Sequence, residues 1–246
     1  MMNTLTAPVT VDPNDPIAVM KRYELKYVLS EEQTAFLKEG IKGDMRPDSY
    51  GLTTITSLYY DTPDHRLIRE SLDKPDFKEK IRLRSYGQAT VSSPVFLELK
   101  RKAYGIVYKR RVQSTVLLAE RFFDGESYTG NESQIQREIT NFIGNYNNLR
   151  PSCIIIYDRT AYFEPDGDLR LTIDENPRYR MDDLDLTSSL SGIPLLNEGG
   201  SILEIKVQDA IPLWLSALLS KGRIYKNSFS KYGEAYRREL LAAANQ

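Results

Sequence analysis

The chain has 246 residues and a formal net charge of −1, with 33 lysines and arginines against 34 aspartates and glutamates. This balance gives no overall field toward nucleic acid or membrane, so strong attraction for an anion must come from local clusters of cations. The one cysteine excludes a disulfide within the chain, and no apolar run approaches the ~20 residues that span a bilayer. We therefore predict a cytoplasmic protein with no membrane insertion, no nucleic-acid partner and no evident obligate protein partner.

Residues 1–16 are rich in Thr, Pro, Asp and Asn, which predicts a flexible leader before a single domain over 17–246. The domain should open with a strand over 22–29. Ser30-Glu31-Glu32-Gln33 has the capping-box pattern that starts a helix, which we extend to residue 41.

Further elements follow from periodicity and from turn residues. The predicted strands lie at 53–61, 77–86, 95–103, 106–112, 152–163, 169–174 and 201–208, and the predicted helices lie at 64–72, 115–123, 133–146, 211–220 and 230–243. Asp166-Gly167 predicts a hairpin turn, and 178–200 is expected to be a loop.

Charged and aliphatic residues alternate along these strands. Successive side chains on a strand point to opposite faces, so each strand carries its charges on one face and its aliphatic residues on the other. The pattern recurs in Glu24-Leu25-Lys26, Arg82-Leu83-Arg84, Glu98-Leu99-Lys100 and Glu204-Ile205-Lys206. Such repetition indicates that the charges converge on one anionic, metal-bound ligand.

About eight such strands, mostly joined as hairpins, predict an α+β fold in which a closed antiparallel β-barrel forms a charged tunnel jacketed by helices. In the alternative, the apolar face lies inside and the charged face is simply solvated. Amphipathic helices favour the charged lumen, because they need an apolar outer surface to pack on. The expected lumen cations are Lys26, Arg82, Arg84, Lys100, Arg159, Arg170 and Lys206.

Other residue types leave few chemical options. His65, the one histidine, is interpreted as a surface or capping residue, and Cys153 as a buried apolar residue, so a zinc site is not expected. Carboxylates remain, and they favour Mg²⁺ or Mn²⁺. The segment 226–232 leads into a helix and is either an ordinary capped helix start or a phosphate clamp.

Seven segments stand in order between residues 21 and 236: Arg22-Tyr23-Glu24-Leu25-Lys26-Tyr27, Ser57-Leu58-Tyr59-Tyr60-Asp61-Thr62-Pro63, Lys80-Ile81-Arg82-Leu83-Arg84, Phe96-Leu97-Glu98-Leu99-Lys100, Asp158-Arg159-Thr160-Ala161, Leu203-Glu204-Ile205-Lys206 and Phe229-Ser230-Lys231-Tyr232. As a set they resemble the motifs of the VTC domain. This domain is the polyphosphate polymerase branch of the triphosphate tunnel metalloenzyme, or CYTH-like, superfamily.

The resemblance implies transfer of the terminal phosphate of ATP to a growing polyphosphate chain, with Mn²⁺ or Mg²⁺ as cofactor. Glu204 would be the main metal ligand, with Glu24, Glu98 and Asp174 as further candidates. The candidate catalytic residues are Lys26, Arg82, Arg84, Lys100, Arg159 and Lys206. The candidate phosphate-binding residues are Lys80, Arg170, Lys226, Ser230 and Lys231.

Two departures from the family pattern bear on this interpretation. Arg22 stands where the hydrolase and cyclase branches carry the first glutamate of Glu-x-Glu-x-Lys, which favours synthesis. Ser228 stands where the polymerases often carry a lysine, and Lys226 is the candidate to replace it. An inorganic triphosphatase and a non-catalytic sensor of polyphosphate or nucleotide remain the alternatives.

Overall fold

The computed structural model describes residues 23–73, 75–104, 106–125, 133–146 and 148–244. The leader predicted over 1–16 and the side chain of Arg22 lie outside these ranges. No helix within them is long and apolar enough to cross a bilayer.

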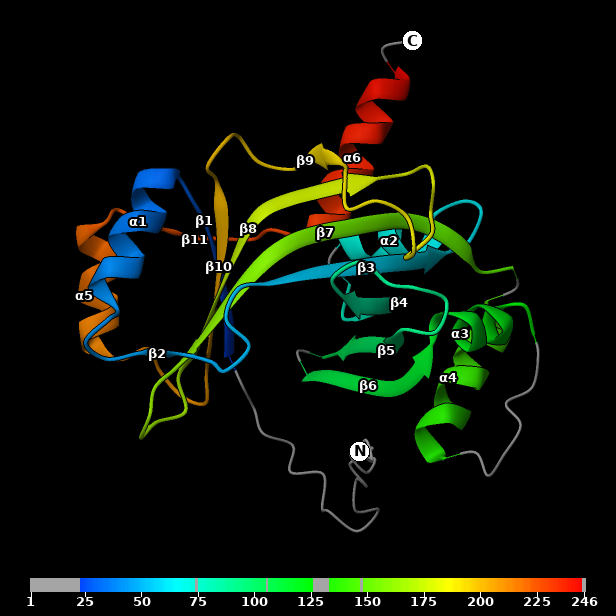
Figure 1. Cartoon of the computed structure of the whole chain (residues 1–246), viewed down its shortest axis with the longest axis horizontal. Coiled ribbons are helices and arrows are strands. Elements are labelled where there is room, and N and C mark those ends of the chain that lie inside the picture. Colours follow the sequence, from blue (N-terminus) through cyan, green and yellow to red (C-terminus); the bar gives the residue numbers. More distant parts are fainter. Residues whose placement is uncertain (1–22, 74, 105, 126–132, 147, 245–246) are drawn as a thin grey trace, which may run out of the picture.

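One antiparallel sheet of eleven strands, accompanied by six helices, forms the described part of the chain (Figure 1). The strands are β1 (Tyr23–Leu29), β2 (Arg46–Pro47), β3 (Thr53–Asp61), β4 (Phe77–Tyr86), β5 (Pro94–Ala103), β6 (Ile106–Thr115), β7 (Arg150–Phe163), β8 (Arg170–Arg180), β9 (Ile193–Pro194), β10 (Ser201–Val207) and β11 (Lys226–Asn227). The helices are α1 (Glu31–Gly40), α2 (Arg66–Leu72), α3 (Val116–Phe123), α4 (Gln134–Asn145), α5 (Leu213–Lys221) and α6 (Lys231–Ala244).

Most predicted elements are confirmed within a few residues. The Ser30 capping box is present at the start of α1, where the hydroxyl accepts from the backbone N–H of Gln33 and the Gln33 side chain accepts from that of Ser30. Two strands were predicted too short, because β6 runs on to Thr115 and β8 enters the segment predicted as a loop over 178–200. That segment also contains the short strand β9. β8 runs on to Arg180, past Asn176 and Pro177, because a register shift opposite Ile156 of β7 absorbs the irregular backbone there.

The sheet is not closed into a barrel, so the predicted closed barrel of about eight strands is wrong. Its order is β11-β1-β10-β8-β7-β3-β4-β5-β6, with β2 beside β7 and β9 beside β8. Alternation assigns faces to a strand, but closure also requires the tilt and stagger that bring the last strand into register with the first. Here β1 bonds to the two-residue β11 instead of to β6.

The open sheet is nevertheless strongly curved (Figure 1). Glu24 of β1 and Lys100 of β5 are six places apart in the strand order, yet their side chains approach to 3.8 Å. We call the side of the sheet on which these two side chains meet the inner face. On β1, β4, β5 and β10 most charged residues lie on this face and most aliphatic residues lie on the outer face. On β3 and β7 the register also places Ile55, Cys153 and Ile155 on the inner face, where α6 packs on them.

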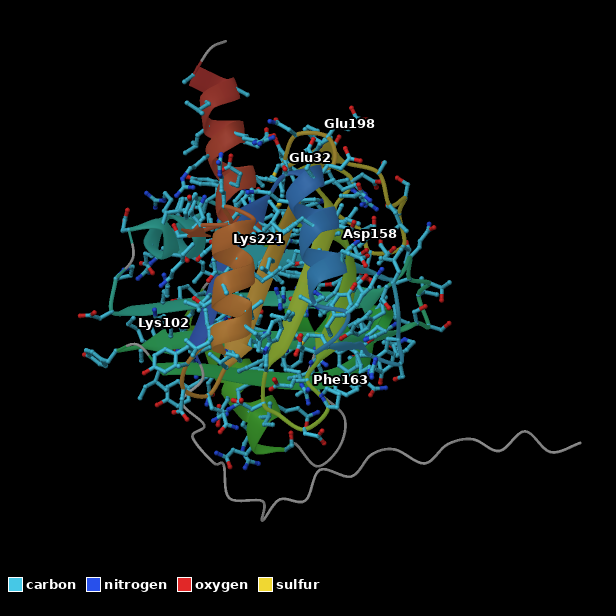
Figure 2. The ribbon with its side chains drawn as sticks, turned by 90° about the vertical axis from the view of Figure 1, so that its left-hand side faces the viewer. Glu32, Lys102, Asp158, Phe163, Glu198 and Lys221 are labelled. Atoms are coloured by element: carbon cyan, nitrogen blue, oxygen red, sulfur yellow. The ribbon has the colours of Figure 1, made fainter. Side chains whose placement is uncertain are left out.

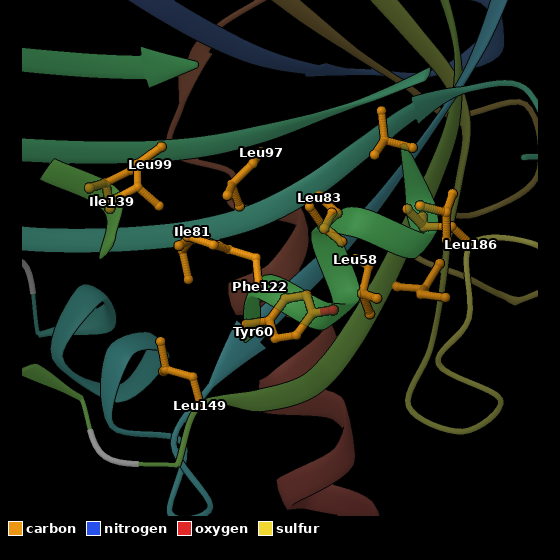
Figure 3. Packing of buried hydrophobic residues seen from close by; sticks show 14 of the residues in the cluster. Leu58, Tyr60, Ile81, Leu83, Leu97, Leu99, Phe122, Ile139, Leu149 and Leu186 are labelled. Carbon is orange, nitrogen blue, oxygen red and sulfur yellow. The ribbon is translucent and has the colours of Figure 1, made fainter. Parts of the chain in front are cut away.

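Two apolar cores cover the outer face. In the first, α3 and α4 pack on β3 to β7 around Ile81, Leu83, Leu97 and Leu99 (Figure 3). In the second, α1 and α5 lie side by side over β1, β8 and β10 (Figure 2), with Leu37 and Leu215 fully buried. These four helices therefore occupy the apolar side, as the amphipathic patterns indicated.

Helix α6 packs on a third core at β3, β7 and β8. The ring of Tyr232 stacks on that of Tyr59, with centroids 4.7 Å apart. Its hydroxyl donates to Asp61 (2.9 Å) and contacts the Ser152 hydroxyl (2.8 Å). Gly233 permits this approach, because a Cβ there would meet Leu72 of α2 at 2.8 Å.

Asp61 is fully buried, and it joins α2 to α6. Its carboxylate accepts from the backbone N–H groups of Thr62, Leu67 and Ile68 as well as from Tyr232. It thereby satisfies donors at the start of α2 that His65, the cap residue, leaves without a side-chain bond. The motif residue Asp61 thus has a structural role.

We predict that Asp61→Ala lowers the free energy of unfolding by about 2–4 kcal/mol, because several buried donors lose a charged acceptor. Urea unfolding followed by circular dichroism measures this. Asp44→Ala, at an exposed loop position, is the control and should change stability by less than about 0.5 kcal/mol. Equal stability of the two variants would contradict the assigned role.

Candidate functional site

Four carboxylates and nine cations contact one another on the inner face. The carboxylates are Glu24, Glu98, Asp174 and Glu204; the cations are Lys26, Arg82, Arg84, Lys100, Lys109, Arg111, Arg159, Lys206 and Lys231. Nine against four leaves an excess of five positive charges. We call this set the cation cluster.

Glu98 of β5 lies at the centre of one half of the cluster. It is 2% exposed, and its oxygens lie 2.7 Å from Arg82, 2.8 Å from Lys109 and 3.8 Å from Arg84. Arg111 of β6 donates to it from Nε at 2.7 Å. Burial raises the pKa of Glu98, but Arg82, Arg84 and Lys109 together hold it well below the usual range. Glu98 therefore acts as a counter-charge that orders four cations.

Glu204 of β10 and Glu24 of β1 form the other half. Lys206 lies 2.6 Å and Lys26 3.6 Å from Glu204, and Lys26 also lies 3.0 Å from Glu24. Burial raises the pKa of Glu204, but Lys206 and then Lys26 outweigh it, so the group stays ionised. Lys100 reaches across to Glu24 from β5. These contacts link the two ends of the curved sheet.

Asp174 of β8 connects the cluster to α6. It accepts two hydrogen bonds from Arg159, at 2.6 and 2.8 Å, and one from Lys231 at 2.5 Å. Ser230 caps α6 by accepting from the N–H of Gly233 at 3.2 Å. The start of α6 therefore brings one cation and one hydroxyl to the inner face.

Lys80 of β4 lies on the inner face beside the cation cluster, but it does not share the ion pairs that define the cluster. Its ammonium group donates to the Ser230 hydroxyl at 3.3 Å, and among the residues described it has no carboxylate within 4.0 Å. Burial, and then Lys78, Lys100, Lys26 and Arg82, lower its pKa to about 7. A bound phosphate would supply the charge partner that Lys80 lacks.

The structure brings most of the predicted site residues together, but not all. Arg170 is exposed at the start of β8, where its guanidinium lies over the ring of Phe163. Lys226 pairs in register with Tyr27, whose side chain belongs to the outer core, whereas Asn227 pairs with Lys26. The register thus places Lys226 on the opposite face from the cluster.

Sequence reasoning missed several members of the site. Lys109 and Arg111 stand opposite Lys100 and Glu98 in the β5–β6 register. The hydroxyl of Tyr59 accepts from Arg82 at 2.8 Å, and that of Tyr157 accepts from Arg84 at 3.2 Å. The alternation in 106–112 gave a signal for the two cations, but no local pattern distinguished the tyrosines from core residues.

The prediction of Cys153 as a buried apolar residue is confirmed, and that of His65 as a surface or capping residue is confirmed for the cap position. His65 is the cap residue of α2, half-buried, with Nδ1 3.2 Å from the Ser152 hydroxyl. Cys153 is buried, and burial raises the pKa of its thiol. Neither residue belongs to the cation cluster.

The carboxylates do not form a metal cage by themselves. Within the described residues, no group of three or more His, Cys, Asp or Glu is arranged to hold a metal ion. Mg²⁺ and Mn²⁺ are commonly held by one or two carboxylates together with phosphate oxygens. Glu204, 14% exposed on the inner face, fits such a site if the phosphates of a ligand complete it.

Residues 21–239 match the family model of the VTC domain, and the chain therefore belongs to the VTC domain family. This confirms the resemblance seen in the motifs. The family is one of tunnel-type enzymes that act on phosphates or nucleotides and generally depend on a divalent metal.

Two solved structures are similar to this chain. A Bacillus halodurans protein described as a "putative adenylate cyclase" has a TM-score of 0.53 and 13% identity, over 86% of this chain and 96% of that one. A Vibrio parahaemolyticus protein of the same description has a TM-score of 0.49 and 12% identity, over 88% and 98%. The comparison with curated proteins gave no match. The likeness to the Bacillus protein is consistent with a CYTH-like fold.

We predict that Glu98→Gln lowers the free energy of unfolding by about 3–5 kcal/mol at pH 7, because four cations lose a buried counter-charge. Glu24→Gln, at a side chain that is 31% exposed, should lose less than about 1 kcal/mol. The folded pKa of Glu98 is depressed, so its contribution is present above the unfolded value of ~4.3 and is lost as the pH falls. Urea unfolding at pH 7 and below pH 4 tests this; a variant as stable as the parent at pH 7 would refute it.

We predict a pH dependence of tripolyphosphate affinity that comes from Lys80. Below pH 7 the free protein already carries the charge, but above pH 7 it must take up a proton on binding, so affinity should fall by up to about tenfold per pH unit. Calorimetry between pH 7 and 8.5 should show a shallower decline for Lys80→Met. Lys109, whose pKa burial lowers to about 8, contributes the remainder. Equal slopes for parent and variant would exclude Lys80.

Proposed function

We propose that this protein is a metal-dependent polyphosphate polymerase that transfers the terminal phosphate of ATP to a growing polyphosphate chain. The observation that carries the proposal is the excess of five positive charges on the inner face of a VTC domain. Confined like charges repel where water screens them poorly, so such a face favours a polyanion. Local clustering supplies this attraction although the whole chain is nearly neutral.

Phosphoryl transfer demands positioning and charge neutralisation more than covalent assistance. A terminal oxygen of the acceptor polyphosphate attacks the γ-phosphorus of ATP; the bond from that phosphorus to the β–γ bridging oxygen breaks, and ADP leaves. An ionised phosphate oxygen needs no general base. The protein's contribution is a set of fixed donors, including Arg82, Arg84 and Lys100, that neutralise the charge on donor and acceptor.

Glu98 and Asp174 prepare these donors for the ligand. Each holds arginine or lysine side chains from different elements, so the donors are ordered before binding. Lys231 and Ser230 would reach the phosphates from the start of α6, on the same inner face. Glu204 would hold Mg²⁺ or Mn²⁺, and the metal when bound supplies further neutralisation of phosphate charge.

Synthesis is favoured over hydrolysis by Arg22, which lies outside the described residues. In the hydrolase and cyclase branches a glutamate at this position would help to hold metal, whereas an arginine adds a phosphate contact. The cyclase description of the Bacillus and Vibrio proteins applies to those proteins. This chain departs from the Glu-x-Glu-x-Lys motif of the hydrolase and cyclase branches at Arg22.

The proposal is tested by incubating the purified protein with ATP and Mn²⁺ or Mg²⁺. We expect ADP release together with polyphosphate that is visible on a stained gel. If only phosphate or pyrophosphate is released, the protein is a triphosphatase and the polymerase proposal is wrong. If the protein binds polyphosphate but does not consume ATP, the remaining interpretation is a non-catalytic sensor.

We predict that Glu204→Gln retains tripolyphosphate binding within about tenfold but loses metal-dependent turnover, because the cations bind and this carboxylate holds the metal. Glu175→Gln is the matched control: its carboxylate pairs with Lys38 at 2.7 Å, outside the cation cluster, and turnover should persist. Calorimetry with and without Mn²⁺ separates the two effects. An unchanged metal response in Glu204→Gln would remove this residue from the metal site.

A further inference from the structure

The charged pattern of the inner face ends in two aromatic side chains. On β4 the inner-face positions Lys78, Lys80, Arg82 and Arg84 are followed by Tyr86, the last residue of the strand. On β5 the positions Lys102, Lys100 and Glu98 are followed by Phe96. The change from charge to aromatic ring occurs at the same end of both strands, because Phe96 stands directly opposite Arg84 in the register.

The two rings meet and are joined to the cation cluster. Their centroids lie 5.8 Å apart at an interplanar angle of 82°, an edge-to-face contact. The guanidinium of Arg111 lies 4.3 Å from the centre of the Phe96 ring and also binds Glu98. Arg111 therefore connects the aromatic pair to the carboxylate around which Arg82 and Arg84 are ordered.

Tyr86 does not contribute to a core. It is 48% exposed, and neither it nor Phe96 belongs to the three apolar cores. An exposed aromatic ring at the end of a polar face is a stacking platform for a flat ligand, and bases stack on such rings with little preference among them. Arginine adds a planar cation that also stacks on bases.

We propose that Tyr86, Phe96 and Arg111 form a subsite for the nucleobase of the nucleoside triphosphate whose phosphates lie along Arg84 and Arg82. This inference rests on the proposed function, because it requires a nucleotide donor. Tyr86 lies two residues from Arg84 on the same face, about 7 Å along the strand, so a ribose would span the interval. The subsite gives the cluster a means to prefer a nucleotide over an inorganic triphosphate.

The test compares two ligands that share a triphosphate but differ in the base. Dissociation constants of a non-hydrolysable ATP analogue and of tripolyphosphate are measured by calorimetry with Mg²⁺ for the parent, Tyr86→Leu and Phe96→Leu. We expect either substitution to weaken the analogue by roughly 5- to 150-fold, the range for loss of one stacked base, and tripolyphosphate by less than twofold.

Tyr108→Leu is the matched control. Tyr108 is 39% exposed on the neighbouring strand β6, but it stands opposite Arg101 in the register and therefore on the outer face. Both ligands should bind Tyr108→Leu as tightly as they bind the parent. Thermal unfolding shows whether each variant is folded, and Tyr86→Leu is the safer variant because Tyr86 is the more exposed of the two rings.

The outcomes separate the two proposals. If both ligands weaken equally, or neither weakens, the base subsite is overturned while the phosphate site stands. If the parent protein binds neither ligand, the proposed function fails, and the base subsite fails with it.

Discussion

Repulsion among cations on one face of the sheet is the constraint on which the rest of this structure depends. Nine cations contact only four carboxylates on the inner face, so the folded chain must hold like charges together. Burial of the aliphatic residues on the outer face supplies the opposing free energy, because α1, α3, α4 and α5 cover that face. The same strands thus carry the stabilising apolar residues on one face and the repelling cations on the other.

The carboxylates have distinct physical roles that their residue type does not reveal. Glu98 and Asp174 are each 2% exposed and are surrounded by cations, so they serve as buried counter-charges. Glu204 is the carboxylate that we propose as the ligand of a metal completed by phosphate oxygens. Asp61 belongs to neither group, since it satisfies backbone donors of α2 and holds Tyr232 of α6.

Curvature brings the cluster together without closure of the sheet. Glu24 and Lys100 meet across the open sheet through a side-chain contact in place of a backbone ladder. Helix α6 adds to this by carrying Ser230 and Lys231 to the inner face, where they contact Lys80 and Asp174. The inner face therefore combines cations from both halves of the cluster with one from the C-terminal helix.

The sequence by itself determined the longer elements, most of their faces and the family, because alternation, caps and turns depend on neighbouring residues. Lys26, Arg82 and Lys206 could be placed on one face in this way, and Asp166-Gly167 marked a turn that the β7–β8 hairpin confirms. Closure, the outward position of Lys226 and the role of Glu98 depended on register between strands distant in sequence. Only the tertiary structure decided these, since tilt, stagger and burial are properties of the whole sheet.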